Sequence, residues 1–138
     1  MPNDTLVDTD ESTYHVGETW DYKTRPGEEG STLTIVRVGS SPSYGVIVSV
    51  RIDGLRMESP NAKDGAFVEI AHVPFAEAAI EASVTNRAAV GVPASAESDA
   101  GYEEWRTHFD AGAAGFWTVS VAEAVEVIAE GLRSQESQ

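Results

Sequence analysis

Glu18 and His72 are the two residues whose types and positions could support acid–base chemistry. In an alternating strand predicted over residues 14–23, Glu18 shares a face with Trp20 and other apolar side chains. A carboxylate on such a face is partly desolvated, which raises its pKa unless a cation holds it ionised. His72 likewise shares a face with apolar residues in a strand predicted over residues 66–73.

If both faces point into the core, Glu18 and His72 could form an acid–base pair, and the chain would be a weak acid–base enzyme or a ligand-processing domain. Trp20, Arg37 and Arg51 are the ligand-binding candidates of this hypothesis, because either arginine could be a charge partner. The alternative is structural: Glu18 bonds a backbone amide or an arginine, and His72 caps a helix. The two residues have no diagnostic spacing, so the structural interpretation is favoured.

The motifs of the common enzyme classes are absent. The chain has no P-loop, dinucleotide-binding glycine motif, zinc-protease helix, nucleophile elbow or EF-hand loop. Its three histidines, His15, His72 and His108, have no metal-ligand spacing, so we expect no metal site. No sequence feature points to a cofactor, and we expect none.

The chain is strongly acidic. Its 138 residues include 23 acids and 9 bases, and the net charge of −14 argues against binding to nucleic acid. The absence of cysteine excludes disulfides and thiol nucleophiles. No apolar run has the length of a membrane span, and the polar start lacks the apolar stretch of a signal peptide. We expect a bacterial cytoplasmic protein without a membrane partner.

The acidity is concentrated in residues 74–138, which carry eleven acids and three bases. Glu123, Glu126 and Glu130 share one face of a predicted helix at i, i+3 and i+7. Such a surface could steer a basic partner toward the protein. An immunity-like inhibitor of a basic partner is therefore an alternative hypothesis, with these three glutamates as its partner-binding residues. Part of the acidity is equally expected from a high-GC or salt-adapted genome, because lysine is rare and alanine abundant.

The first half of the chain is predicted to form an antiparallel meander. Its β-branched and alternating segments predict strands over residues 14–23, 31–38, 45–52, 55–57 and 66–73. Asp53-Gly54 has the sequence of a type I′ turn and predicts a tight hairpin. A polar loop is expected over residues 58–65.

The second half is predicted to be helical. The period changes at Pro74, which suits a first helical position, and this helix should fade between Asn86 and Gly91. A second helix begins after Ser98 as N-cap. It carries an aromatic stripe that predicts packing on the sheet, with a ligand-stacking platform as the alternative: Tyr102, Trp105 and Phe109.

A third helix is expected to run to about Arg133, after a capping box formed by Ser120 and Glu123. Its buried stripe is predicted to consist of Val121, Val125, Ile128 and Leu132.

Strands followed by helices predict a single α+β domain over residues 14–133. We expect an antiparallel sheet of four to six strands in residues 14–73, extended by a short strand at residues 116–119, with about three helices packed on one face. Residues 1–13 are acidic and poor in large apolar side chains, so a disordered tail is expected there. Residues 134–138 are expected to fray.

Two segments resemble small bacterial proteins of unknown function. The first runs from Val16 to Glu28 and opens with the pattern Val-Gly-x-x-Trp-x-Tyr. The second is Gly101-Tyr102-Glu103-Glu104-Trp105. The resemblance covers about a quarter of the chain and implies no activity, cofactor or site residue.

A non-catalytic binding module is the function that these observations favour. It would bind a protein or a small ligand through an open sheet face or through the acidic helical half. An exposed sheet face or edge strand would also allow a homodimer by two-fold pairing. The sequence does not choose among these partners.

Overall fold

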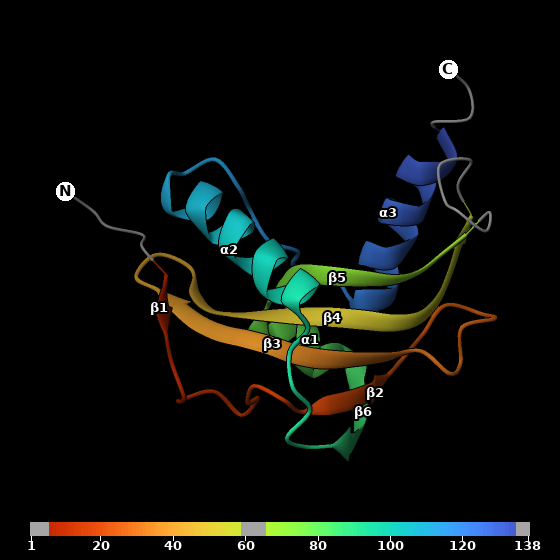
Figure 1. Cartoon of the computed structure of the whole chain (residues 1–138), viewed down its shortest axis with the longest axis horizontal. Coiled ribbons are helices and arrows are strands. Elements are labelled where there is room, and N and C mark those ends of the chain that lie inside the picture. The colour runs from red at the N-terminus through yellow and green to blue at the C-terminus, as the bar shows by residue number, and fades with distance from the viewer. Residues whose placement is uncertain (1–5, 59–65, 135–138) are drawn as a thin grey trace.

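The computed structural model describes residues 6–58 and 66–134. Within these ranges, only the backbone is described for residues 57–58, 66–68 and 132–134. Within these ranges the chain forms a six-stranded antiparallel sheet and three helices (Figure 1), which confirms the predicted α+β class. The strands are β1 Val7–Asp8, β2 Thr19–Tyr22, β3 Thr32–Ser41, β4 Gly45–Glu58, β5 Ala66–Ala76 and β6 Val84–Ala89. The helices are α1 Glu77–Ser83, α2 Ala96–Asp110 and α3 Val121–Ser134.

The strand order of the sheet is β5-β4-β3-β2-β6, and β1 pairs with the far end of β3 on the same side as β2. The long strands β3, β4 and β5 run side by side across the middle of Figure 1, with β2 and β6 below them. The predicted loop over residues 58–65, the side chain of Leu132 and most of the frayed end at 134–138 lie outside the described residues.

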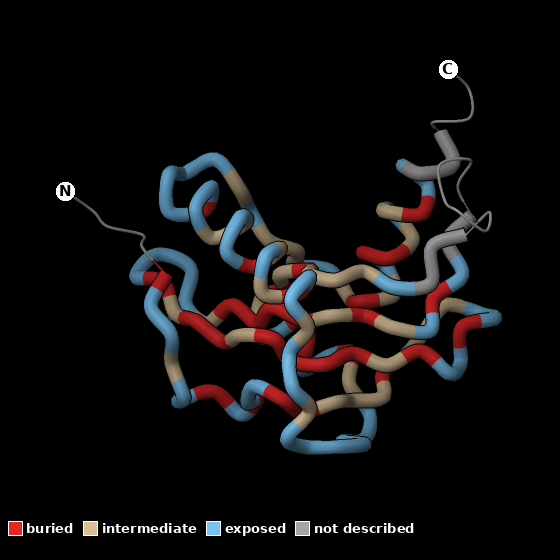
Figure 2. Tube along the Cα trace, viewed as in Figure 1, coloured by how far each residue is buried: buried red, intermediate tan, exposed pale blue. Residues whose placement is uncertain are grey.

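Alternation along β4 gives the sheet two apolar faces. Val48, Val50 and Ile52 belong to a buried cluster that also contains residues of α1 and α3. Ile47 points to the opposite face, in a second cluster with Leu6, Val36, Tyr102 and Phe109. Figure 2 shows the buried residues concentrated in these central strands.

The helices therefore cover both faces of the sheet, not one face as predicted. α1 and α3 contribute Ile80, Val121 and Val125 to the first cluster, whereas α2 contributes Tyr102 and Phe109 to the second. The physical reason is that β3 and β4 carry apolar side chains on both faces, so each face needs a cover. The packing role predicted for the aromatic stripe of α2 is confirmed.

The hairpin predicted at Asp53-Gly54 is wrong, because β4 continues through this dipeptide. Gly54 has a φ of 78°, and the pairing of β4 with β5 shifts register between Asp53 and Met57. The dipeptide thus forms a β-bulge. A Cβ atom on Gly54 would lie 3.0 Å from the Cα of Ser31, so glycine is needed both for the backbone angle and for the close approach.

Pro74 lies in β5, not at the start of a helix. β5 is an outer strand, so a residue without an N–H is tolerated there. Trp117 extends this edge as an isolated bridge: its amide donates to the Pro74 carbonyl (3.0 Å) and its carbonyl accepts from the Ala76 amide (2.8 Å). α1 begins only at Glu77, and the predicted fading of the helix between Asn86 and Gly91 is replaced by strand β6, which pairs with β2.

Of the two helix starts predicted from capping residues, one differs in the structure and the other agrees. α2 begins three residues early, because the side chain of Ser95, not Ser98, caps it by accepting from the Ser98 amide (3.1 Å). Before α3, Ser120 accepts from the Glu123 amide (3.2 Å) as predicted. The Glu123 carboxylate accepts from the Ser120 hydroxyl (3.3 Å).

The disordered tail predicted for residues 1–13 is wrong for residues 6–13; residues 1–5 are not described. Leu6 is fully buried, and its amide donates to Asp110 (2.9 Å). A Cβ on Gly39 would lie 2.6 Å from the Leu6 side chain, so this glycine makes room for it. One leucine and a short β1 pairing thus anchor a segment whose composition favours disorder.

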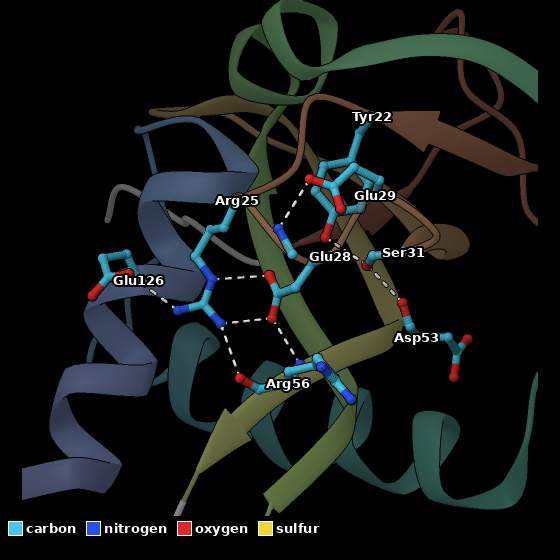
Figure 3. A network of polar contacts seen from close by, with 9 residues as sticks. Tyr22, Arg25, Glu28, Glu29, Ser31, Asp53, Arg56 and Glu126 are labelled. Carbon is cyan, nitrogen blue, oxygen red and sulfur yellow. Dashed lines mark hydrogen bonds and ion pairs between the residues drawn. The ribbon is translucent and has the colours of Figure 1, made fainter.

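An ion-pair network centred on the buried Glu28 joins the β2–β3 turn to β4 and α3 (Figure 3). Arg25 binds Glu28 through Nε (2.8 Å) and Nη2 (2.6 Å), and its Nη1 donates to Glu126 (3.1 Å). The Glu28 carboxylate also accepts from the Arg56 amide (2.7 Å) beside the Gly54 bulge. Burial acts to raise the pKa of Glu28, but these donors outweigh it and lower the pKa.

We predict that Glu28→Ala lowers the free energy of unfolding by about 1–3 kcal/mol, because the half-buried Arg25 guanidinium keeps only Glu126 and the Arg56 carbonyl as acceptors, and the Arg56 amide loses its acceptor. Urea denaturation measures the change. The neighbouring variant Glu29→Ala, whose side chain is exposed, is the control and should change little. Equal effects of the two variants would contradict a structural role for the network.

Gly54→Ala should destabilise the protein more than Gly27→Ala. Both glycines have positive φ (78° and 89°), which costs alanine about 1–2 kcal/mol. A methyl group added at Gly54 would contact backbone atoms of residues 30 and 31, whereas a methyl group added at Gly27 would have no atom within 4 Å. The clash should add about 1–3 kcal/mol. Thermal or urea unfolding of both variants tests this, and equal losses would show that the close approach is unimportant.

Candidate functional site

Glu18 is buried and fully engaged by the fold. Its carboxylate accepts hydrogen bonds from the His15 amide (2.9 Å), the Trp20 indole (3.2 Å) and Nη1 of Arg87 (3.2 Å). Burial by itself would raise the pKa of Glu18, but these donors outweigh it and hold the pKa below its ordinary value. The residue matches the structural interpretation: an ionised anchor between the turn before β2 and strand β6.

His72 lies half-buried on β5 beneath α2. Its Nε2 is 2.9 Å from the Ser49 hydroxyl, and its ring centroid lies 5.8 Å from that of Tyr102 and 5.5 Å from that of Trp105. Burial lowers the pKa of His72 to about 4, so the imidazole is neutral at pH 7. The predicted capping role is wrong, because α1 begins five residues later and has Ala76 as its N-cap.

The sheet separates Glu18 from His72. Glu18 bonds Trp20, which packs against the cluster of α1 and α3. His72 contacts Tyr102, which belongs to the cluster of α2 on the other face. The two side chains therefore share no partner among the described contacts and do not form the acid–base pair considered from the sequence.

The three ligand-binding candidates do not form one site, because Trp20 packs against the cluster of α1 and α3 whereas Arg37 and Arg51 both reach α2. Trp20 packs edge-to-face on Tyr14, with 5.6 Å between ring centroids. Arg37 lies over the ring of Tyr102 at 5.2 Å and pairs with Asp8 and Asp99. Arg51 binds Asp53, Glu69 and the α2 cap Ser95. All three side chains hold elements together, and none lines either of the two hollows described below.

Two of the three predicted partner-binding glutamates have partners within the fold. Glu123 is part of the α3 cap, and Glu126 accepts from Arg25. Glu130 is exposed on the outer side of α3. Steering of a basic partner by this face stays a prediction.

A hollow of about 460 Å³ lies along one face of α2, and we refer to it as the α2 hollow. Its lining comes from one face of the helix and from the loop that follows: Gly101, Glu104, Trp105, His108, Ala113 and Ala114. The four helix residues follow the i, i+3, i+4, i+7 spacing that places side chains on one face. The hollow thus combines a carboxylate, an indole and an imidazole with small apolar side chains.

Two glycines build the α2 hollow. Gly112, with a φ of 77°, ends α2 and turns the chain back, with the Ala113 amide bonded to the His108 carbonyl (2.8 Å). Gly101 lets the helix approach β5, because a Cβ there would lie 2.9 Å from the Cβ of His72. The close approach brings the His72 ring against Trp105.

Trp105 is held in place from several sides. Its indole N–H donates to the Gly115 carbonyl (2.8 Å), and its ring lies 5.0 Å from that of Phe109 and 5.5 Å from that of His72, measured between centroids. Unlike Tyr102 and Phe109, it is only partly buried. Two rings of the aromatic stripe thus form core, and the third lines a surface hollow; the ligand-stacking alternative stays a prediction.

Sequence reasoning missed Gly101, Glu104, His108 and the loop alanines as site residues. A glycine inside a helix was the available signal, because such a residue often marks close packing. Only the return of the loop after Gly112 places Glu104 and His108 in a hollow.

A second hollow of about 600 Å³ follows the N-terminal segment, lined by residues 7–11 and Ser40. It contains three carboxylates, of which Asp8 lies within 4 Å of Arg37 and of Arg106. In the described part of the chain, no group of three or more His, Asp or Glu side chains is placed to hold a metal ion. This hollow therefore offers less defined chemistry than the α2 hollow, despite its size.

No match was found when the chain was compared with protein-family models, curated proteins and solved structures. Among the described residues, no helix has the length and apolar composition to cross a membrane. The resemblance of residues 16–28 and 101–105 to small bacterial proteins stays a prediction. Function has to be argued from the geometry of the chain.

His72→Gln should reduce the loss of stability on acidification. The folded pKa of about 4 lies below the ordinary 6.5, so between these values the unfolded chain binds a proton that the folded chain does not. Stability therefore falls as the pH drops from 7 to 5, by about 1–2 kcal/mol from this residue. Urea unfolding at both pH values measures it. An unchanged slope in H72Q would contradict the assignment.

Proposed function

We propose that this protein is a non-catalytic binding module that takes an arginine side chain of a basic partner protein at the α2 hollow. The observation that carries the proposal is that Glu104 and Trp105 both line a hollow of about 460 Å³. An indole attracts a cation to its π face, and a carboxylate forms charge-assisted bonds with it. Together they select a positively charged group.

A cation from outside the chain is favoured by the way the arginines are used within it. In the described residues, five arginines are in ion pairs with acids other than Glu104: Arg25, Arg37, Arg51, Arg87 and Arg106. Glu104 itself is exposed and has no described ion pair. The carboxylate is therefore available to a partner.

The shape of the hollow favours a protein side chain over a small metabolite. Gly101, Ala113 and Ala114 provide apolar contact but no deep walls, whereas small-molecule sites bury most of the ligand surface. A guanidinium suits the site better than an ammonium, because its planar group stacks on an indole while its N–H groups reach a carboxylate. The acidic second half of the chain supports the proposal by attracting a basic protein over a distance.

The test is an NMR titration of ¹⁵N-labelled protein with the blocked peptide acetyl-Leu-Arg-Leu-amide. The indole signal of Trp105 and the amides of Gly101, Ala113 and Ala114 should shift, with a Kd near the millimolar range expected for one side chain. The indole signals of Trp20 and Trp117 should stay in place. A peptide with citrulline, the neutral analogue of arginine, should bind at least about tenfold more weakly.

Glu104→Gln is the decisive variant, and Glu103→Gln is its matched control. Both remove one charge from neighbouring exposed positions of α2, but only Glu104 lines the hollow. We expect E104Q to weaken binding by about three- to tenfold and E103Q to act only through long-range attraction, which salt screens. Equal losses of peptide affinity in both variants, or NMR shifts at residues away from the α2 hollow, would contradict the proposal.

A further inference from the structure

Strand β6 ends the sheet with an open edge. It pairs with β2 on one side, and among the described residues no strand pairs with its other side. Residues 85–89 are all exposed. An open strand presents unpaired N–H and C=O groups, which another strand can satisfy. The opposite edge of the sheet, on β5, is different, because it contains Pro74 and is extended by Trp117.

Two exposed valines lie beside the end of this edge. Val90 follows β6 directly and is 64% exposed, and Val16 precedes β2 and is 55% exposed. Their segments are held together, because the Val92 amide donates to the Gly17 carbonyl (2.9 Å). A Cβ on Gly17 would lie 3.2 Å from the Val92 carbonyl oxygen, so the two backbones are in contact. The open edge thus has an apolar border.

The β6 edge is also free of acidic residues, although the chain as a whole is strongly acidic. At a net charge of −14, two copies repel each other wherever acidic surfaces meet. Residues 82–96 contain no Asp or Glu. Arg87, the only base among them, is already paired with Glu18. The outer sides of α2 and α3, by contrast, carry exposed glutamates. β6 is therefore a surface on which two copies can meet without bringing acidic side chains of this segment together.

We propose that two copies of this chain pair through β6 as antiparallel neighbours, which joins their sheets into one continuous sheet. Identical strands paired antiparallel are related by a two-fold axis, so the same surface serves both copies and the assembly closes as a dimer. Backbone hydrogen bonds across the edges and the valine border provide the contact. The proposal rests on other residues than those of the α2 hollow and stands or falls independently of the proposed function.

Sedimentation or light scattering of the whole chain tests the assembly. From about 1 to about 300 μM, the molar mass should rise from that of one chain to that of two. Added salt should strengthen the dimer, because it screens the repulsion between acidic copies. Added salt should instead weaken the binding of the arginine peptide at the α2 hollow. Dimer formation and peptide binding therefore respond to salt in opposite directions and can be distinguished. A monomer at every concentration would overturn the proposal.

Val90→Glu and Val127→Glu form a matched pair of variants. Both place one charge at an exposed valine, 64% and 51% exposed, but Val127 lies on α3, away from β6. Two-fold pairing brings the two added charges of V90E to the same interface, so we expect its dimer Kd to rise at least about tenfold. V127E should dimerise like the wild type. A dimer unaffected by V90E would use another surface and would contradict the proposal.

Disulfide mapping gives a second readout that does not depend on affinity. The chain contains no cysteine, so one introduced cysteine can link only to its copy. Cysteine is placed in turn at Thr85, Asn86 and Ala88; opposed residues of antiparallel neighbours have Cα atoms about 4.5–5.5 Å apart, within disulfide reach. At least one of these variants should form a covalent dimer under mild oxidation, and Val127→Cys should not. Cross-linking by V127C alone would overturn the assignment of the edge.

Discussion

The burial of both faces of β3 and β4 is the constraint from which the rest of the architecture follows. Val48 and Ile47 are neighbours in sequence, yet one belongs to the cluster under α1 and α3 and the other to the cluster under α2. A strand buried on both faces needs a cover on each. The helices therefore divide between the faces, and Leu6 is drawn into the second core, which orders an otherwise acidic N-terminal segment.

The same burial decides what the buried carboxylates do. Glu18 and Glu28 lie where a charge is costly, and each is surrounded by backbone, indole or guanidinium donors that keep it ionised. Glu28 additionally satisfies the amide that the bulge at Gly54 leaves beside it. These residues are structural. His72 is held neutral by burial and serves as a packing surface for α2. The chemistry available to partners is consequently found on the surface, not in the core.

Two surfaces of opposite character result. The α2 hollow presents Glu104 and Trp105 in the acidic half of the chain, a combination suited to a cation. The β6 edge is free of acidic residues and bordered by two exposed valines, a combination suited to a like-charged copy. The α2 hollow borders the second hydrophobic cluster through Trp105 and Ala114, whereas the exposed residues 85–89 of β6 lie outside both clusters. A binding module that presents its site twice, through a two-fold axis, would gain avidity for a partner with several arginines.

The sequence by itself determined what depends on local pattern: the α+β class, the alternation of β4, the cap of α3 and the aromatic stripe of α2. Strand alternation and helical spacing are patterns of a few neighbouring residues, so they can be recognised without knowledge of the fold. Tertiary structure decided whether Asp53-Gly54 formed a turn or a bulge, because both use the same dipeptide and only the pairing of the following residues with β5 distinguishes them. It also decided that Glu18 and His72 lie on opposite faces of the sheet, because this depends on how the strands pair. Likewise, Glu104 and Trp105 line one hollow only because the loop after Gly112 turns back toward α2.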